Sequence, residues 1–145
     1  MRILIVAVGK AKDRALRDLL DEYYSRVRRH VPCDEIELRD GKGVDQAIIG
    51  AIPNGAHVVA LEVEGKQLTS PELAQRLVQW GTTGKGIVAF VIGGADGLAD
   101  TVLKRANDKL SLSRLTMAHR VARVALAEQV YRAVSIWRGE PYHRD

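Results

Sequence analysis

The chain has 145 residues, of which 46% are hydrophobic and 28% are charged. A chain of this length and composition can bury one core, so we expect a single domain over residues 1–145. One cysteine, Cys33, excludes an internal disulfide, and the four histidines lack the close spacing of a zinc site. No apolar run is long enough to cross a bilayer, so we expect no contact with a membrane. Together with the single cysteine and the scattered histidines, this predicts a cytoplasmic protein without a bound metal.

The charge is distributed unevenly along the chain. From Lys104 onward, nine lysines or arginines stand against four acids, a net charge of +5, whereas the whole chain carries +4. A basic surface of this kind favours a polyanionic partner such as nucleic acid. A solvated helix face with ordinary lysines and arginines accounts for the same residues.

Apolar runs and amphipathic stretches alternate in the first part of the chain. Residues 3–8 are rich in β-branched side chains, which is typical of a strand buried on both faces of a parallel sheet. Leucines at helical spacing follow and predict a helix from Asp13 to near His30. A short strand over residues 35–39 and a helix over residues 44–51 come next.

The same alternation continues towards the C-terminus. A strand over residues 57–63 is expected to end in a turn at residues 64–66, and Ser70 is expected to cap the next helix. That helix is expected to end at the break formed by Gly81 and Gly84. The remaining predicted elements are a strand over residues 86–92, a helix over 98–107, a strand over 109–113 and a long helix over 118–137.

This alternation predicts an α/β fold in which helices flank a mostly parallel sheet. Ligands bind such sheets beyond the carboxyl ends of the strands, where loops lead into helices. The loops that follow the third, fourth and fifth strands, residues 61–65, 93–97 and 115–118, are therefore the predicted pocket.

The fourth strand runs into a glycine-rich turn, Gly93-Gly94-Ala95-Asp96-Gly97. Glycine backbone can approach a ligand closely because it carries no Cβ. The spacing is not that of a dinucleotide fingerprint, and no phosphate-binding loop with its lysine is found. An ordinary tight turn, with Asp96 as the cap of the next helix, is the alternative interpretation.

Residues 112–117 mix apolar side chains with hydroxyls just before the longest predicted helix. Such a segment can clasp a flat heteroaromatic ring, with apolar groups above and below it and backbone groups at its edge. A buried strand followed by a helix cap at Thr116 explains the same residues.

Polar side chains near the C-terminus form a second candidate group. His119 and Arg123 are four residues apart and share a helix face, while Glu128 precedes another arginine by the same spacing. Apolar residues lie between these charges, so some of the charges must lie at the edge of buried surface and need partners. A surface salt-bridge ladder is the alternative for the helix, and a frayed terminus is the alternative for Tyr142 and His143.

Taken together, these segments resemble the ribosomal RNA large subunit methyltransferase H family. The resemblance implies a SPOUT-type fold with a C-terminal trefoil knot, a homodimer, and S-adenosylmethionine as the methyl donor bound at the knot. Ala95-Asp96 departs mildly from the family's pattern, but the glycines of the turn are intact. The resemblance covers essentially the whole chain and is carried by residues 1–9, 61–66, 90–97, 112–119, 123–133 and 141–143.

The resemblance also implies a substrate and a set of contacts. The substrate is a pseudouridine in helix 69 of 23S rRNA, methylated at N3 in the assembled 70S ribosome. Tyr142 is a candidate stacking platform for that base. The implied cofactor contacts are Leu61, Gly93, Leu112, Ser113, Arg114, Leu115, Thr116 and Met117.

Methyl transfer to N3 requires the loss of a proton from the ring, so a base or a nearby cation should help. His119, Glu128 and His143 are the candidate bases. Arg123 and Arg132 are candidate stabilisers of the developing anion or contacts to phosphate. The sequence does not rank them.

No separate RNA-binding module is predicted beside the α/β domain. We therefore hypothesise that the dimer and the shape of the whole ribosomal particle select the nucleotide. A non-catalytic RNA-binding protein with the same fold is a competing hypothesis, which the intact glycine turn disfavours. A flavodoxin-like nucleotide binder is disfavoured as well, because the loop after the first strand lacks phosphate-binding chemistry.

Overall fold

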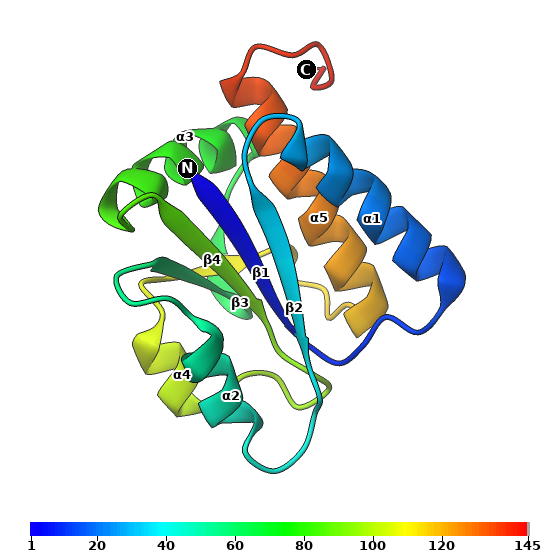
Figure 1. Cartoon of the computed structure of the whole chain (residues 1–145), viewed down its shortest axis with the longest axis vertical. Helices are drawn as coiled ribbons and strands as arrows, with labels where there is room; N and C mark the ends of the chain where they lie inside the picture. The colour runs from blue at the N-terminus through cyan, green and yellow to red at the C-terminus, as the bar shows by residue number, and fades with distance from the viewer. Residues whose placement is uncertain (145) are drawn as a thin grey trace.

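Helices cover both faces of one five-stranded parallel sheet, which confirms the predicted α/β class (Figure 1). The computed structural model describes residues 1–144. None of the helices in this range has the length and apolar character needed to cross a membrane. The strands are β1 (Arg2–Val8), β2 (Cys33–Leu38), β3 (His57–Gln67), β4 (Ile87–Ile92) and β5 (Asp108–Ser111). The helices are α1 (Arg14–Arg28), α2 (Val44–Ala51), α3 (Ser70–Thr83), α4 (Asp100–Arg105) and α5 (His119–Trp137).

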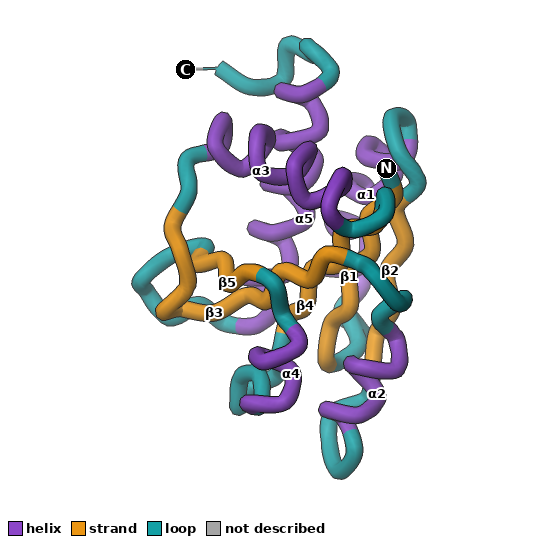
Figure 2. The backbone as a smooth tube through the Cα atoms, turned by 90° about the vertical axis from the view of Figure 1, so that its left-hand side faces the viewer, coloured by secondary structure: helices purple, strands orange, loops and turns teal. Residues whose placement is uncertain are grey.

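The strand order β2-β1-β4-β3-β5 places β1, β4 and β3 in the interior of the sheet. Helices α1, α3 and α5 pack on one face, and α2 and α4 pack on the other (Figures 1 and 2). Successive side chains of a strand point to opposite faces, so Ile3 and Ile5 join the first layer, whereas Leu4 and Val6 join the second. The unbroken apolar run of β1 follows from this, because a helical layer buries each of its faces.

All strand pairs are parallel, so the carboxyl ends of the strands lie along one edge of the sheet. At that edge β1 leads into Gly9, β4 into Gly93 and β5 into Leu112. His119, the first residue of α5, returns to the same place, since a Cβ at Gly9 would lie 3.6 Å from its Cε1 atom. The fold therefore gathers the predicted loops and the start of α5 at one edge.

Strand β3 does not end at the predicted turn but continues to residue 67, with an irregularity in the middle. Leu61 and Lys66 both pair with Leu110 of β5, so the four residues between them bulge out of the ladder. Gly65 permits the close approach of the two strands, because a Cβ there would lie 2.8 Å from the backbone carbonyl carbon of Lys109. The predicted turn was wrong, since its glycine serves a bulge inside the strand.

The predicted helix cap at Ser70 is wrong as well, and the two caps considered as alternative interpretations, Asp96 and Thr116, do not occur. Thr69, not Ser70, caps α3: its hydroxyl accepts a hydrogen bond from the N–H of Glu72, whose carboxylate accepts one from the N–H of Thr69. Neither Asp96 nor Thr116 caps a helix, because α4 and α5 begin later, each after an alanine without a side-chain bond. Both residues lie instead in loops at the carboxyl edge of the sheet.

Candidate functional site

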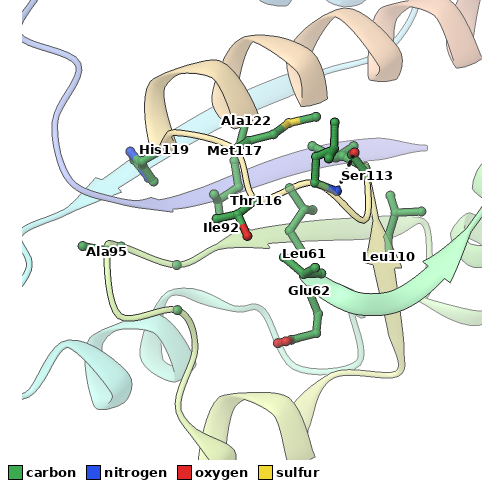
Figure 3. Close-up of a pocket in the computed structure, with 16 residues that line it drawn as sticks. Leu61, Glu62, Ile92, Ala95, Leu110, Ser113, Thr116, Met117, His119 and Ala122 are labelled. Atoms are coloured by element: carbon green, nitrogen blue, oxygen red, sulfur yellow. Dashed lines mark hydrogen bonds between the residues drawn. The ribbon is translucent and has the colours of Figure 1, made fainter.

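A pocket of about 200 Å³ opens at the carboxyl edge of the sheet (Figure 3). It lies between the bulge of β3, the glycine turn after β4 and the segment that leads from β5 into α5. Parallel sheets bind ligands at this edge. The three loops that the sequence predicts as a pocket therefore do come together around one cavity.

Seven of the eight residues expected to contact a cofactor line this pocket, and His119 lines it too. The eighth, Arg114, has an exposed side chain outside the lining. Ile92, Leu110 and Ala122 also line the cavity, although no sequence signal separates apolar residues of strands and helices from ordinary core. The seven residues are Leu61, Gly93, Leu112, Ser113, Leu115, Thr116 and Met117.

The glycine turn folds tightly on itself beside the pocket. A Cβ at Gly93 would lie 2.7 Å from the carbonyl carbon and oxygen of Gly97 and 3.1 Å from Leu98 Cγ. The N–H of Gly97 donates to the carbonyl of Gly94 at 3.0 Å, and Gly97 has a left-handed φ of +74°. Gly93, Gly94 and Gly97 therefore present backbone without side chains to the cavity, which is what close contact with a ligand requires.

Local hydrogen bonds hold the segment between β5 and α5. The Ser111 hydroxyl donates to the carbonyl of Ser113 at 3.0 Å, and the Ser113 hydroxyl accepts from the N–H of Leu115 at 2.9 Å. Leu112 and Met117 are partly buried, whereas Leu115 is 78% exposed. This arrangement offers apolar surface and backbone polar groups together, a combination that suits a planar heterocycle.

His119 brings a titratable group to the pocket at the beginning of α5. Burial lowers the pKa of this imidazole, the nearby charge of Arg123 lowers it further, and Asp40 raises it in part. Its Nε2 atom is buried without a hydrogen-bond partner within residues 1–144. The side chain is therefore suited to be neutral at pH 7 and to accept a proton.

We expect His119 to titrate below pH 6.5, the usual value for an imidazole, because the folded chain disfavours its charged form. The folded state then binds fewer protons than the unfolded state, so the contribution of His119 to stability is present above the unfolded pKa. It is lost as the pH falls through the folded pKa. A histidine NMR titration measures the pKa directly, and His119→Gln should flatten the dependence of unfolding free energy on pH in this window.

Arg123 is buried and binds carboxylates of the neighbouring strand β2. It is 1% exposed, with Nη2 2.6 Å from Glu35 Oε2 and Nη1 2.7 Å from Glu37 Oε2. Nη1 also donates to the carbonyl of Gly9 at 3.2 Å, and Arg17 binds Glu35 from the other side. Arg123 does not line the pocket, so its placement supports a structural role and not the predicted contact to an anion.

A second polar group forms where the C-terminal segment folds back on α5. Glu128 Oε1 lies 2.7 Å from Arg132 Nη2, which confirms the pair predicted from helical spacing. Tyr142 donates its hydroxyl to Glu128 Oε1 at 2.9 Å and packs on the Tyr131 ring at 4.6 Å. Arg132 Nη1 lies 3.1 Å from His143 Nδ1. Tyr142 and His143 are therefore ordered against the helix rather than frayed.

The pocket and the polar group around Glu128 lie at different positions along α5. His119 and Glu128 are nine residues apart in this helix, which separates them by about 14 Å at 1.5 Å per residue. The C-terminal segment lies near the far end of the helix from the pocket (Figure 1). Burial and the bond to Glu128 raise the pKa of Tyr142 to about 12, so its phenol stays a hydrogen-bond donor. One chain thus brings only His119, of the five predicted catalytic residues, to the cavity.

Comparisons with known proteins agree with this geometry. A family model described as a predicted SPOUT methyltransferase matches residues 1–143. A protein of Sorangium cellulosum named ribosomal RNA large subunit methyltransferase H is 50% identical over 143 residues, which is 98% of this chain and 99% of the relative. One of the same name from Bacillus pumilus is 44% identical over 159 residues, covering 99% of this chain and all of the relative.

The fold is also similar to that of a solved structure. TrmJ from Z. mobilis aligns with a TM-score of 0.54 over 99% of this chain and 73% of its own, at 14% identity. At that identity the likeness concerns the fold alone. A SPOUT-type fold agrees with the class expected from the sequence, and SPOUT membership implies its C-terminal trefoil knot.

Proposed function

We propose, from the premise that this chain belongs to the SPOUT methyltransferase family, that it methylates 23S ribosomal RNA with S-adenosylmethionine as the donor. The proposed target is N3 of a pseudouridine in helix 69 of the assembled 70S ribosome. One observation carries the proposal: seven residues expected to contact the donor come from two separate loops and from strand β3, and they line one cavity. Relatives that cover the whole chain share the name of a large-subunit rRNA methyltransferase, which supports the choice of substrate.

The pocket suits the chemistry of the donor. Leu112 and Met117 supply apolar surface for an adenine ring, and the backbone at Gly93 can approach the ligand without a Cβ between them. Glu62 brings a carboxylate to the lining, which can accept hydrogen bonds from ribose hydroxyls or face positive charge. The donor supplies the methyl group, and the chain holds it in line with the acceptor nitrogen.

The acceptor must lose its N3 proton as the new carbon–nitrogen bond forms and the carbon–sulfur bond breaks. His119 is the candidate base within the chain's own pocket, because its buried Nε2 is unpaired and its lowered pKa favours the neutral form. Glu128 and His143 are the other candidates, and both belong to the C-terminal group. Neither of them lines the cavity of its own chain, so they can act there only if another copy of the chain brings them to it.

In the proposed homodimer, the second subunit contributes these residues. Leu115, which lines the pocket, is 78% exposed, and Val121, in the first turn of α5, is 56% exposed. Exposed apolar side chains at the rim of a site mark a surface that a partner covers. We propose that a second copy covers this rim and brings the partner subunit's Tyr142 and the partner subunit's His143 to the cavity.

Mixing two inactive variants tests this arrangement. We expect a His143→Ala chain and a Gly93→Ala chain, each inactive alone, to restore about one quarter of wild-type activity when mixed at equal amounts. Half of the dimers are then mixed, and one of their two sites combines an intact pocket with an intact C-terminal segment. Restored methyl transfer is read on 70S ribosomes, with each variant assayed alone as the control. No restoration would show that the C-terminal residues serve their own subunit.

The proposed function is tested by transfer of a labelled methyl group from S-adenosylmethionine to 70S ribosomes, with the modified nucleotide mapped afterwards. We expect label at one pseudouridine of helix 69 and micromolar donor binding by calorimetry, about −8 kcal/mol. Absence of donor binding would favour a non-catalytic RNA-binding protein. Equal rates on a free helix 69 oligonucleotide and on 70S particles would contradict selection by the shape of the ribosome.

A further inference from the structure

Some cations of the C-terminal third are held by partners within the chain, so they contribute less to a basic surface than the sequence suggests. Arg123 is buried against two carboxylates, and Arg132 binds Glu128. Arg105 donates to the backbone carbonyl of Ala56. Internal partners therefore occupy part of this positive charge, so the exposed cations in the rest of the chain also bear on where an anionic partner binds.

Two loops at the carboxyl edge of the sheet carry exposed cations. Lys10 and Lys12 lie in the loop between β1 and α1, and Arg39 and Lys42 lie in the loop between β2 and α2. All four side chains are exposed, and within residues 1–144 none of them is in an ion pair. Their charge is free to meet an external anion.

Hydrogen bonds fix these loops to each other. The N–H of Gly9 donates to the carbonyl of Leu38 at 2.6 Å, which joins the end of β1 to the end of β2. The N–H of Ala11 donates to Glu37 Oε2 at 2.7 Å, and the same oxygen binds Arg123. The backbone between Lys10 and Lys12 is therefore tied to the buried ion-pair network and not left to move freely.

The same loops border the pocket. A Cβ at Gly9 would lie 3.6 Å from His119 Cε1, and one at Gly94 would lie 2.7 Å from Asp40 Oδ2. His119 and Gly94 both line the cavity. The exposed cations thus flank the side of the pocket that the glycine turn and the start of α5 form.

The charge of the molecule is concentrated here. The segments 9–14, 39–42 and 112–120 together hold seven lysines or arginines and two aspartates, a net charge of +5, whereas the whole chain carries +4. Asp13, one of the two acids, is already paired with Arg120. The remainder of the chain is close to neutral, so long-range attraction of a polyanion is directed to the pocket edge.

We propose that Lys10, Lys12, Arg39 and Lys42 form a phosphate-binding surface that holds the backbone of the RNA substrate beside the pocket. This inference rests on the proposed function and adds where the RNA lies. Lysine and arginine on fixed loops suit phosphate contacts, which position a nucleic acid without reading its bases. None of the strongly exposed large apolar side chains lies in these two loops, within the part of the chain that the structure describes, which favours a phosphate backbone over an apolar partner surface.

The double variant Lys10→Ala/Lys12→Ala tests the surface. Cosedimentation with 70S ribosomes over a series of salt concentrations should show that the slope of log Kd against log salt falls by about two, one for each lost phosphate contact. At about 150 mM salt the affinity for ribosomes should fall roughly ten- to a hundredfold, and the KM for ribosomes should rise with it. The kcat and the calorimetric affinity for S-adenosylmethionine should stay within about twofold, because neither lysine lines the cavity.

Arg29→Ala/Lys104→Ala is the matched control. It removes the same charge from exposed side chains at the opposite end of the sheet, where α1 ends and α4 leads into β5. We expect its salt slope and KM to remain close to those of the wild type.

The outcomes separate this inference from the proposed function. The phosphate-binding surface would be overturned if both double variants lost the same affinity for ribosomes, or if the salt slope of Lys10→Ala/Lys12→Ala did not change. The proposed function would still stand in either case if the wild type methylated ribosomes. If Lys10→Ala/Lys12→Ala shows the expected lower salt slope but the wild type transfers no methyl group, the proposed function alone would be overturned. A wild type that does not bind ribosomes would overturn both.

Discussion

Replacing Gly93 by alanine is expected to abolish methyl transfer and to weaken binding of S-adenosylmethionine at least a hundredfold, about 3 kcal/mol. The added Cβ would lie 2.7 Å from the carbonyl carbon and oxygen of Gly97, and backbone atoms cannot rotate away as a flexible side chain can. The turn must therefore open, which moves the backbone that faces the cavity. Calorimetry with S-adenosylmethionine measures the loss.

Gly50→Ala is the control for this variant. Gly50 lies in the exposed part of α2, and no heavy atom lies within 4 Å of the position of its Cβ. We expect unchanged donor binding and a gain in stability of about 0.5 to 1 kcal/mol, because alanine is the better helix former. Normal donor binding by Gly93→Ala, with a folded chain, would contradict the placement of the donor against the glycine turn.

Replacing Arg123 by methionine is expected to cost about 3 to 5 kcal/mol of unfolding free energy. The change leaves Glu35 and Glu37 with their charges largely buried and with Arg17 as their remaining cationic partner. It also removes the hydrogen bond to the carbonyl of Gly9, which lies beside the pocket. Urea unfolding followed by circular dichroism measures the difference.

Arg120→Met is the comparison on the same helix. Its partner Asp13 and its own side chain are both substantially exposed, so the loss should be much smaller than that of Arg123→Met. A second comparison adds Glu35→Gln and Glu37→Gln to Arg123→Met, which removes the uncompensated charges and should recover part of the stability. A loss below about 1 kcal/mol for Arg123→Met would show that the network is better solvated than its burial indicates.

The sequence alone determined the class of fold and the location of the pocket. Apolar runs such as β1 alternate with amphipathic stretches, and this pattern is local, so it can be read without knowing the partners of each element. Because parallel strands end at one edge of the sheet, the loops at Gly93 and at residues 112–117 had to converge there. The limits of β3 and the caps of α3, α4 and α5 were not determined, because backbone contacts with distant segments decide them.

Only the tertiary structure decided which charges are available to a ligand. Arg123 and Lys10 carry the same charge in the sequence. In the structure, however, Arg123 is buried and paired with Glu35 and Glu37 of strand β2. Lys10 is exposed and, within residues 1–144, unpaired, and it lies on a loop that hydrogen bonds hold beside the pocket. Tertiary structure also decided that the C-terminal residues pack against the far part of α5, because the docking of Tyr142 on Glu128 is a contact that no periodicity encodes. Ion pairs and docked segments depend on which residues the chain brings together, and local pattern carries no information on that.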